Sequence, residues 1–177
     1  MNYHIISDTH FNHLKLEEWG GRSGNWQDTI WGGLTQIPEG DVLIHMGDIC
    51  IGGDEEVHKQ LVNFTPGVKR ILVRGNHDKK SAVWYYAHGW DFVCDDFHLL
   101  FEGHYIQFSH RPRRQSDTYT HNIHGHTHGN LHRSEEYLDF YMPGYHIDMS
   151  PELVGYKPVR LDTLMKIKKE DRKYPTA

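Results

Sequence analysis

Short apolar runs that are each followed at once by polar side chains constrain this chain more than any other feature. Short apolar runs bounded by turn residues are typical of buried strands. Ligands bind at the carboxyl ends of strands in open α/β sheets, so we expect the side chains that follow these runs to gather at one edge. The runs and the residues that follow them are "YHIIS" (3–7) with Asp8-Thr9-His10, "VLIHM" (42–46) with Gly47-Asp48, "RILVR" (70–74) with Gly75-Asn76-His77-Asp78, "YIQFS" (105–109) with His110, and "NIHG" (122–125) with His126-Thr127-His128.

Helix-like stretches separate the first three runs. Residues 25–37 have apolar side chains at helical spacing after Asn25, a residue type that caps helices. Residues 54–64 begin with acidic side chains suited to a helix N-terminus, and we expect Asp54 to be the cap. A shorter helix is expected over 81–89.

The second half of the chain has a different pattern. Residues 91–110 predict strands joined by a hairpin turn at Glu102-Gly103, and further strands are expected at 121–125 and 145–150. A helix is expected at 161–169. The whole pattern predicts a single layered α/β domain over residues 1–177, with sheets covered by helices.

Composition excludes several classes of protein. The chain has 177 residues, of which 37% are hydrophobic, so it can form a real core. No apolar stretch approaches the ~18 residues of a membrane span, and a net charge of -5 argues against a general nucleic-acid binder. We therefore expect no membrane and no stable nucleic-acid complex. Cys50 and Cys94 are too few for a disulfide framework, which favours a reducing, cytoplasmic location.

The polar residues at the strand ends have the chemistry of metal ligands. Imidazole, carboxylate and amide oxygen together suit Mn, Fe, Ni or Zn better than Mg or Ca. The number of candidates exceeds what one ion with an open position can use, and it suits two ions that share a bridging carboxylate. Such a pair stabilises the attacking and leaving oxygens of a phosphoryl displacement. The candidate ligands are Asp8, His10, Asp48, Asn76, His110, His126 and His128.

In this order and spacing, the residues resemble the complete signature of the calcineurin-like metallophosphoesterases. The likeness runs nearly end to end, and "SDTHFNHLKLEEW" and "YKPVRLDTL" resemble the small bacterial and phage members. The resemblance implies a layered α/β sandwich of two mixed β-sheets flanked by helices. It also implies a cofactor of two divalent metal ions, with Mn as the first choice and Fe, Ni or Zn as alternatives.

The resemblance also assigns roles to individual residues. One ion would be held by Asp8, His10 and His128, the other by Asn76, His110 and His126, and Asp48 would bridge both. A hydroxide between the ions would attack phosphorus. His77 would contact the phosphate and protonate the leaving oxygen, with Asp78 as its orienting partner. Many members have an acidic or amide residue three positions after Gly-Asp, but this chain has Ile51, which leaves one partner of a ligand unassigned.

Other polar residues near these motifs have open interpretations. His13 could line the substrate pocket or lie in a surface turn. Arg22 and Arg111 could contact phosphate, and a solvated loop is the alternative for each. His124 alternates with His126 and is expected to face the other side of its strand, and His45 is expected to be a hydrogen-bonded core histidine.

The favoured function is hydrolysis of phosphate esters, with a small-molecule or nucleotide ester as the substrate. Monoesters and diesters use the same metal core, and only 15 residues separate His110 from His126, which leaves little room for a cap. This favours phosphodiester or cyclic-nucleotide substrates slightly over monoesters. A non-catalytic metal-binding scaffold is the alternative from another class.

Overall fold

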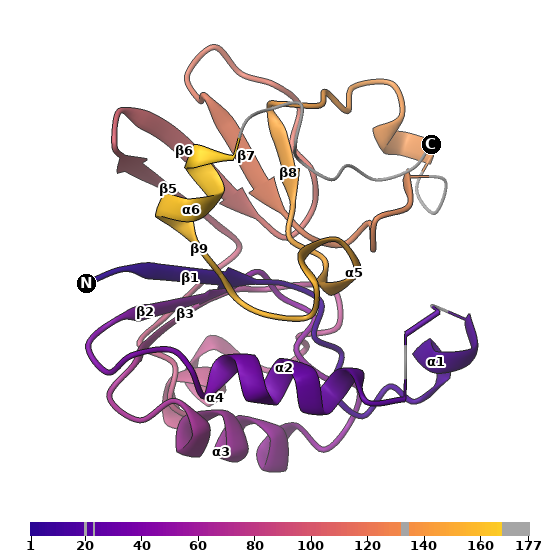
Figure 1. The fold of residues 1–177 in the computed structure, drawn as a ribbon, viewed down its shortest axis with the longest axis vertical. Helices are drawn as coiled ribbons and strands as arrows, with labels where there is room; N and C mark the ends of the chain where they lie inside the picture. The colour runs from indigo at the N-terminus through magenta and orange to yellow at the C-terminus, as the bar shows by residue number, and fades with distance from the viewer. Residues whose placement is uncertain (20, 23, 132–134, 168–177) are drawn as a thin grey trace.

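Two β-sheets pack face to face in the computed structural model, which describes residues 1–19, 21–22, 24–131 and 135–167. Figure 1 shows the sheets as two layers, with helices on the outer side of the layer that contains β1. The last two residues of the helix expected at 161–169 lie outside the described residues. No helix in the described part of the chain is long and apolar enough to cross a membrane.

The first sheet is mixed, with five strands in the order β4-β3-β2-β1-β9. Its first four strands are parallel, and β9 lies antiparallel beside β1. The parallel register places Ile5 opposite Ile44 and Ile44 opposite Ile71, so the ends of β1, β2 and β3 lie level with one another. The strands are β1 (Tyr3–Ile6), β2 (Val42–His45), β3 (Lys69–Val73), β4 (Phe92–Cys94) and β9 (Val159–Arg160).

The second sheet is also mixed, with four strands in the order β5-β6-β7-β8. The hairpin between β5 and β6 turns at Glu102 and Gly103, as expected, and both residues have positive φ angles (46° and 82°). The pairs β6-β7 and β7-β8 are parallel. Two mixed sheets flanked by helices are therefore confirmed. The strands are β5 (Asp96–Phe101), β6 (His104–Ser109), β7 (His121–His124) and β8 (His146–Asp148).

Helices from the first half of the chain cover the outer face of the first sheet (Figure 1). They are α2 (Trp26–Leu34), α3 (Asp54–Phe64) and α4 (Ala82–Ala87). The spacing of Trp26, Ile30 and Leu34 buries one side of α2, as the sequence predicts. The expected cap of α3 is wrong: Asp54 is the first helical residue, and Gly53 occupies the cap position with φ 66°. A carboxylate inside the first turn still interacts favourably with the helix dipole.

Other helical elements are α1 (Lys15–Trp19), the 3-10 helix η2 (Glu135–Tyr137), α5 (Pro151–Val154) and α6 (Leu161–Lys166), and α5 lies between β8 of the second sheet and β9 of the first. In Figure 1, α5 lies where the two layers meet. An apolar core between the sheets includes Ile5 and Ile44 from the first sheet and Phe108 and Ile123 from the second. Each fully buried side chain of this size contributes about 1.5–3 kcal/mol. This packing fixes the two sheets relative to each other, so loops from both can form one site.

Candidate metal centre

The residues predicted as ligands follow the ends of five strands, and the loops that contain them meet at one edge of the sandwich. Asp8 and His10 follow β1, Asp48 follows β2 and Asn76 follows β3; His110 follows β6, and His126 and His128 follow β7. Among the described non-glycine residues, eight have positive φ angles, and five of those are candidate ligands: Asp8, His10, Asp48, His126 and His128. Such backbone strain costs about 1–3 kcal/mol per residue and concentrates at functional sites.

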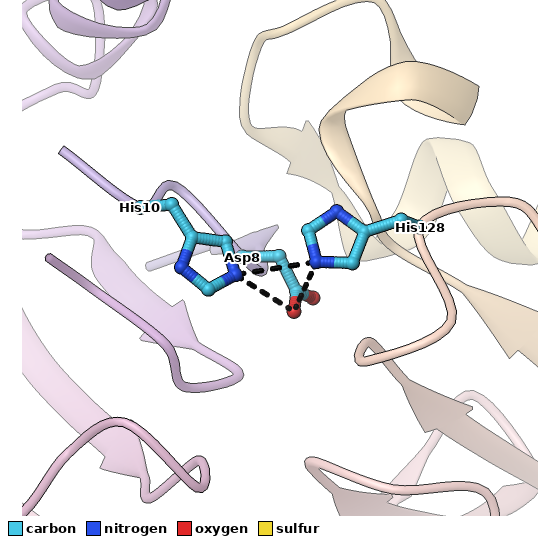
Figure 2. Close-up of side chains that lie close together, drawn as sticks. All are labelled: Asp8, His10 and His128. Atoms are coloured by element: carbon cyan, nitrogen blue, oxygen red, sulfur yellow. Dashed lines mark hydrogen bonds and ion pairs between the residues drawn. The ribbon is translucent and has the colours of Figure 1, made fainter. Parts of the chain in front are cut away.

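One set of donor atoms comes from Asp8, His10 and His128, which we call the first donor group. Figure 2 shows the two rings and the carboxylate pointing toward one another. The Nε2 atoms of His10 and His128 are 3.2 Å apart, and Asp8 Oδ1 lies 3.8 Å and 3.6 Å from them. Asp8 and His10 are buried, so this group is largely shielded from water.

The second donor group consists of Asp48, Asn76, His110 and His126. Its centre is His110 Nε2, which lies 3.1 Å from His126 Nδ1, 3.2 Å from Asn76 Oδ1 and 3.5 Å from Asp48 Oδ2. The same Asp48 oxygen is 3.6 Å from His10 Nε2 of the first group. One carboxylate oxygen therefore lies between the two groups, in the position that a bridging ligand needs.

Both groups fit divalent ions. Donors bound at about 2.1 Å and at tetrahedral or octahedral angles stand roughly 3.0–3.4 Å apart, close to the distances here. Asp8 Oδ2 accepts hydrogen bonds from the Ser7 hydroxyl and the His126 amide, but Asp8 Oδ1 is buried without a hydrogen-bond partner. An unsatisfied buried carboxylate oxygen that faces two imidazole nitrogens is costly unless a cation binds there.

The tautomers of the ligand histidines follow from their outer hydrogen bonds. His110 Nδ1 donates to the Met46 carbonyl at 2.7 Å, and His128 Nδ1 lies 3.1 Å from Glu152 Oε1. In the neutral form of both rings, Nε2 then faces the centre with a lone pair. Burial lowers the pKa of His10 to about 2 and that of His126 to about 3, so these two rings are neutral donors.

Charges among the side chains of the centre compensate one another. Burial raises the pKa of Asp8, although His128 and His110 oppose this shift. Burial would also raise the pKa of Asp48, but its hydrogen bond and ionic interaction with His110 outweigh burial and lower it. The pKa of His110 rises to about 9, because its carboxylate neighbours Asp48 and Asp8 outweigh the burial that would lower it. Without ions, a protonated His110 therefore partly balances the two aspartates.

A cleft of about 260 Å³ opens beside both groups, lined by candidate ligands together with His13, Leu16 and His77. The His77 side chain is 47% exposed, and its Nε2 lies 3.9 Å from Asp48 Oδ2. His13 lies beside His10, with 5.7 Å between ring centroids. A larger hollow of about 550 Å³ lies between α2 and Lys157, but it includes none of the candidate ligands.

Three of the sequence-based assignments differ from the structure. Asp78 was expected to orient the His77 ring, but its carboxylate accepts hydrogen bonds from the amides of Asp48 (2.8 Å), Gly75 (2.7 Å) and Ile49 (3.2 Å). A turn, in which the Asp78 amide donates to the Gly75 carbonyl, directs this side chain back into the protein. Asp78 therefore joins the two loops that contain Asp48 and Asn76.

The two arginines expected near phosphate also lie elsewhere. The Arg22 side chain is 0% exposed and donates to the carbonyls of Asp8 and Thr9, so it is enclosed behind the centre. Arg111 is not among the residues that line the cleft in the described chain, and its guanidinium lies 3.5 Å from Glu136. His45 is fully buried and hydrogen-bonded, as expected, and His124 is also fully buried, with its Nδ1 2.8 Å from the Gly125 carbonyl oxygen.

Sequence reasoning missed Glu152, which contacts both Arg22 (2.9 Å) and His128. It also missed Asp148, which accepts hydrogen bonds from Thr127 and from the hydroxyl and amide of Ser150. Asp148 thereby supports the loop that contains His126 and His128. Asp148 is the last residue of β8 and Glu152 lies in α5, and no glycine-bounded motif precedes either of them.

Comparison with known proteins places the chain in a family. The model of the calcineurin-like phosphoesterase superfamily domain matches residues 1–155, so the chain belongs to this superfamily. The uncharacterised protein MJ1445 of Methanocaldococcus jannaschii is 26% identical over an alignment of 183 positions. This alignment covers 93% of this chain and 89% of the relative. The crystal structure of AQ665, a protein of unknown function from Aquifex aeolicus, has the same fold, with a TM-score of 0.70, 22% identity and coverage of 93% and 98% of the two chains.

Proposed function

We propose that this protein hydrolyses phosphate esters at a centre of two divalent metal ions. The observation that carries the proposal is the position of Asp48 Oδ2, 3.6 Å from His10 Nε2 and 3.5 Å from His110 Nε2. One carboxylate oxygen at similar distances from two sets of nitrogen donors suits a bridge between two ions. Membership of the phosphoesterase superfamily supports the reaction class.

The first donor group would hold one ion and the second group the other, with Asp48 shared. Nitrogen and oxygen donors together favour Mn, with Fe, Ni or Zn as alternatives. The ions would supply activation of water and neutralisation of phosphate charge. The chain itself supplies a buried, fixed arrangement of donors, which the Ser7 and Met46 hydrogen bonds hold before any ion binds.

His77 is placed to act on the substrate. Its ring is exposed at the cleft, and its backbone amide donates to Asp48 Oδ1 at 2.8 Å, which fixes the backbone of His77 beside the proposed bridge. An imidazole there can hydrogen-bond a phosphate oxygen and donate a proton to the leaving oxygen. His13, on the same cleft, is our candidate for a further contact with substrate.

The shape of the cleft supports small-molecule or nucleotide phosphate esters, with a preference for diesters. The cleft is open to solvent at His77, whose side chain is 47% exposed, and the short helix α1 contributes Leu16 to its lining. A diester places groups on both sides of phosphorus, which an open site accommodates and a closed pocket for a terminal phosphate does not. Phosphate monoesters remain the alternative substrate.

The test is an assay of metal-stripped protein reloaded with Mn²⁺, on an aryl phosphate diester and the matching monoester, then on cyclic and linear nucleotides. We expect Mn²⁺-dependent hydrolysis that is faster on the diester. Faster monoester hydrolysis would reverse the substrate preference. If protein that holds two ions hydrolyses none of these esters, the catalytic proposal is wrong and a metal-binding scaffold takes its place.

A further inference from the structure

A buried arginine and a partly buried glutamate form an ion pair directly behind the first donor group. Arg22 Nε lies 2.9 Å from Glu152 Oε1, and the two side chains are 0% and 18% exposed. Neither residue offers an atom to the donor groups themselves. Breaking a buried ion pair leaves an uncompensated charge, so the pair is costly to disturb.

We propose that Arg22 and Glu152 form a clamp that positions the first donor group and sets how tightly it holds its ion. The second donor group does not depend on this clamp. The inference rests on the proposed dinuclear site and names the residues that make its two halves unequal.

Glu152 acts on His128. Its Oε1 accepts the hydrogen bond from His128 Nδ1 at 3.1 Å, which directs the Nε2 lone pair toward Asp8 Oδ1. A carboxylate in this position fixes both the tautomer and the orientation of a ligand imidazole and makes the ring a stronger donor. The same Oε1 accepts from Arg22, so the two contacts share one oxygen.

Arg22 acts on the backbone that holds Asp8 and His10. Its Nη2 donates to the Asp8 carbonyl at 2.9 Å and its Nη1 to the Thr9 carbonyl at 3.1 Å. Asp8 and His10 have φ angles of 47° and 45°, a strained conformation for residues with side chains. A planar guanidinium with fixed donors suits this task. The clamp thus reaches all three residues of the first group.

The guanidinium is enclosed, which excludes a direct role with substrate. It lies over the Trp26 ring, 4.7 Å from the centroid, and 5.9 Å from the centroid of Tyr156. It is not among the residues that line the cleft in the described chain. Arg22 and Glu152 are therefore positioning residues.

A buried arginine elsewhere provides a matched control. Arg70 is 7% exposed and donates to the carbonyls of Thr65 (2.7 Å) and Gly89 (3.0 Å), as Arg22 does to Asp8 and Thr9. Its contacts hold a loop on the helix-covered side of the first sheet. Arg70→Met should therefore destabilise the fold without affecting the ions.

The experiment compares wild-type protein with Glu152→Gln, Glu152→Ala, Arg22→Met and Arg70→Met. Each protein is stripped of metal, titrated with Mn²⁺ and analysed for bound metal by mass spectrometry and for its electron paramagnetic resonance spectrum. The unfolding temperature in chelator reports the fold without metal. We expect wild-type and Arg70→Met protein to bind two ions and to give the spectrum of a spin-coupled pair.

For Glu152→Gln we expect one ion to bind about 10–100-fold more weakly while the other keeps its affinity, because the lost charge acts on one ligand ring. The coupled spectrum should give way to that of isolated Mn²⁺. Glu152→Ala should have a larger effect than Glu152→Gln, since glutamine retains the acceptor oxygen. Arg22→Met should also weaken one ion.

The clamp is wrong if Glu152→Gln and Glu152→Ala hold both ions with wild-type affinity. It is also wrong if they weaken both ions equally, or if Arg70→Met weakens one ion as much as they do. A wild-type protein that binds fewer than two ions contradicts the proposed dinuclear function instead. Counting ions therefore separates the failure of the clamp from the failure of that function.

Discussion

The two donor groups have similar ligands, but different parts of the chain hold them in place. In the second group, the outer nitrogen of His110 donates to the backbone carbonyl of Met46, at the end of a buried strand. In the first group, the outer nitrogen of His128 contacts the side chain of Glu152, from α5. A backbone carbonyl is fixed by the sheet itself, whereas a side-chain contact depends on one residue. We call each donor group, together with the ion it would hold, one half of the centre. Single substitutions should therefore affect the metal affinities of the two halves differently.

The largest effect is expected where the two halves meet, at Asp48. Asp48→Asn removes the charge of the oxygen that lies between the groups, so both ions should bind weakly and turnover should fall by about 10³-fold or more, as several kcal/mol of charge stabilisation are lost. Metal content and turnover, measured on the same preparation, check this. Retention of both ions at wild-type affinity would show that Asp48 is not the bridge.

His77→Ala should affect rate without affecting either half. The ring is 47% exposed and outside both donor groups, so both ions should remain bound. Loss of proton donation should lower kcat by about 10²–10⁴-fold. A substrate with a better leaving group should recover part of the loss, because it needs less protonation. Metal loss equal to that of Asp48→Asn would contradict this role.

Gly125 and Gly75 allow a comparison of the two halves, because a side chain at each position would overlap a different ligand. A Cβ at Gly125 would overlap the Ser7 hydroxyl and the Asp8 carboxylate, while a Cβ at Gly75 would overlap the Asp48 carboxylate and amide. Gly125→Ala should displace Asp8 and therefore weaken the ion of the first group most, by about tenfold or more, whereas Gly75→Ala should weaken both ions to a similar degree. Binding isotherms for Mn²⁺ test this, with Gly32→Ala as the control because a Cβ there meets no atom within 4 Å. The same loss in both variants would argue against two separable halves.

The positions of the ligands along the chain could be predicted because they depend only on short local sequence patterns. Apolar runs mark the strands, and the residue after each run lies at the strand end whatever the remote packing. The partners of the ligands could not be predicted in this way. Arg22 and Glu152 are separated by 130 positions, and α5 is only four residues long, too short for a periodic pattern. Asp78 shows the opposite error, since it neighbours His77 in sequence but its side chain turns toward the Asp48 amide.

The length of the elements explains the remaining differences in the fold. β9 has two residues, and it pairs with β1 only because the chain returns to that edge after the second sheet. Neither its composition nor its spacing distinguishes it from a loop. The longer helices and the hairpin at Glu102 and Gly103 were predictable, because amphipathic spacing and turn residues act within a few positions.

The smallest expected effect concerns His45, which contacts the loops of both groups. Thr9 Oγ1 donates to the Ile49 carbonyl, so it accepts from His45 Nε2 (2.9 Å), and His45 Nδ1 accepts from the Gly47 amide (3.2 Å). Burial lowers the pKa of His45 to about 3. Protonation would place a second hydrogen between Nδ1 and the Gly47 amide, and should disturb both halves alike.

The sign of the pH effect follows from the folded pKa of about 3, which is below the unfolded value of about 6.5. Between these values the unfolded chain binds a proton that the folded chain does not, so the stabilisation is complete above pH 6.5 and is lost as pH falls. At pH 5 the loss from this one group is about 2 kcal/mol.

Urea unfolding of metal-free protein at pH 7.5 and 5 should show a smaller difference in unfolding free energy between the two pH values for His45→Gln than for wild-type protein. His58→Gln is the matched control, because His58 is also buried and has a pKa lowered to about 4 but contacts Trp90 instead of the centre. His58→Gln should reduce the pH difference similarly and leave Mn²⁺ binding unchanged, whereas His45→Gln should weaken both ions to the same degree. Unequal weakening of the two ions by His45→Gln would show that His45 belongs to one half alone.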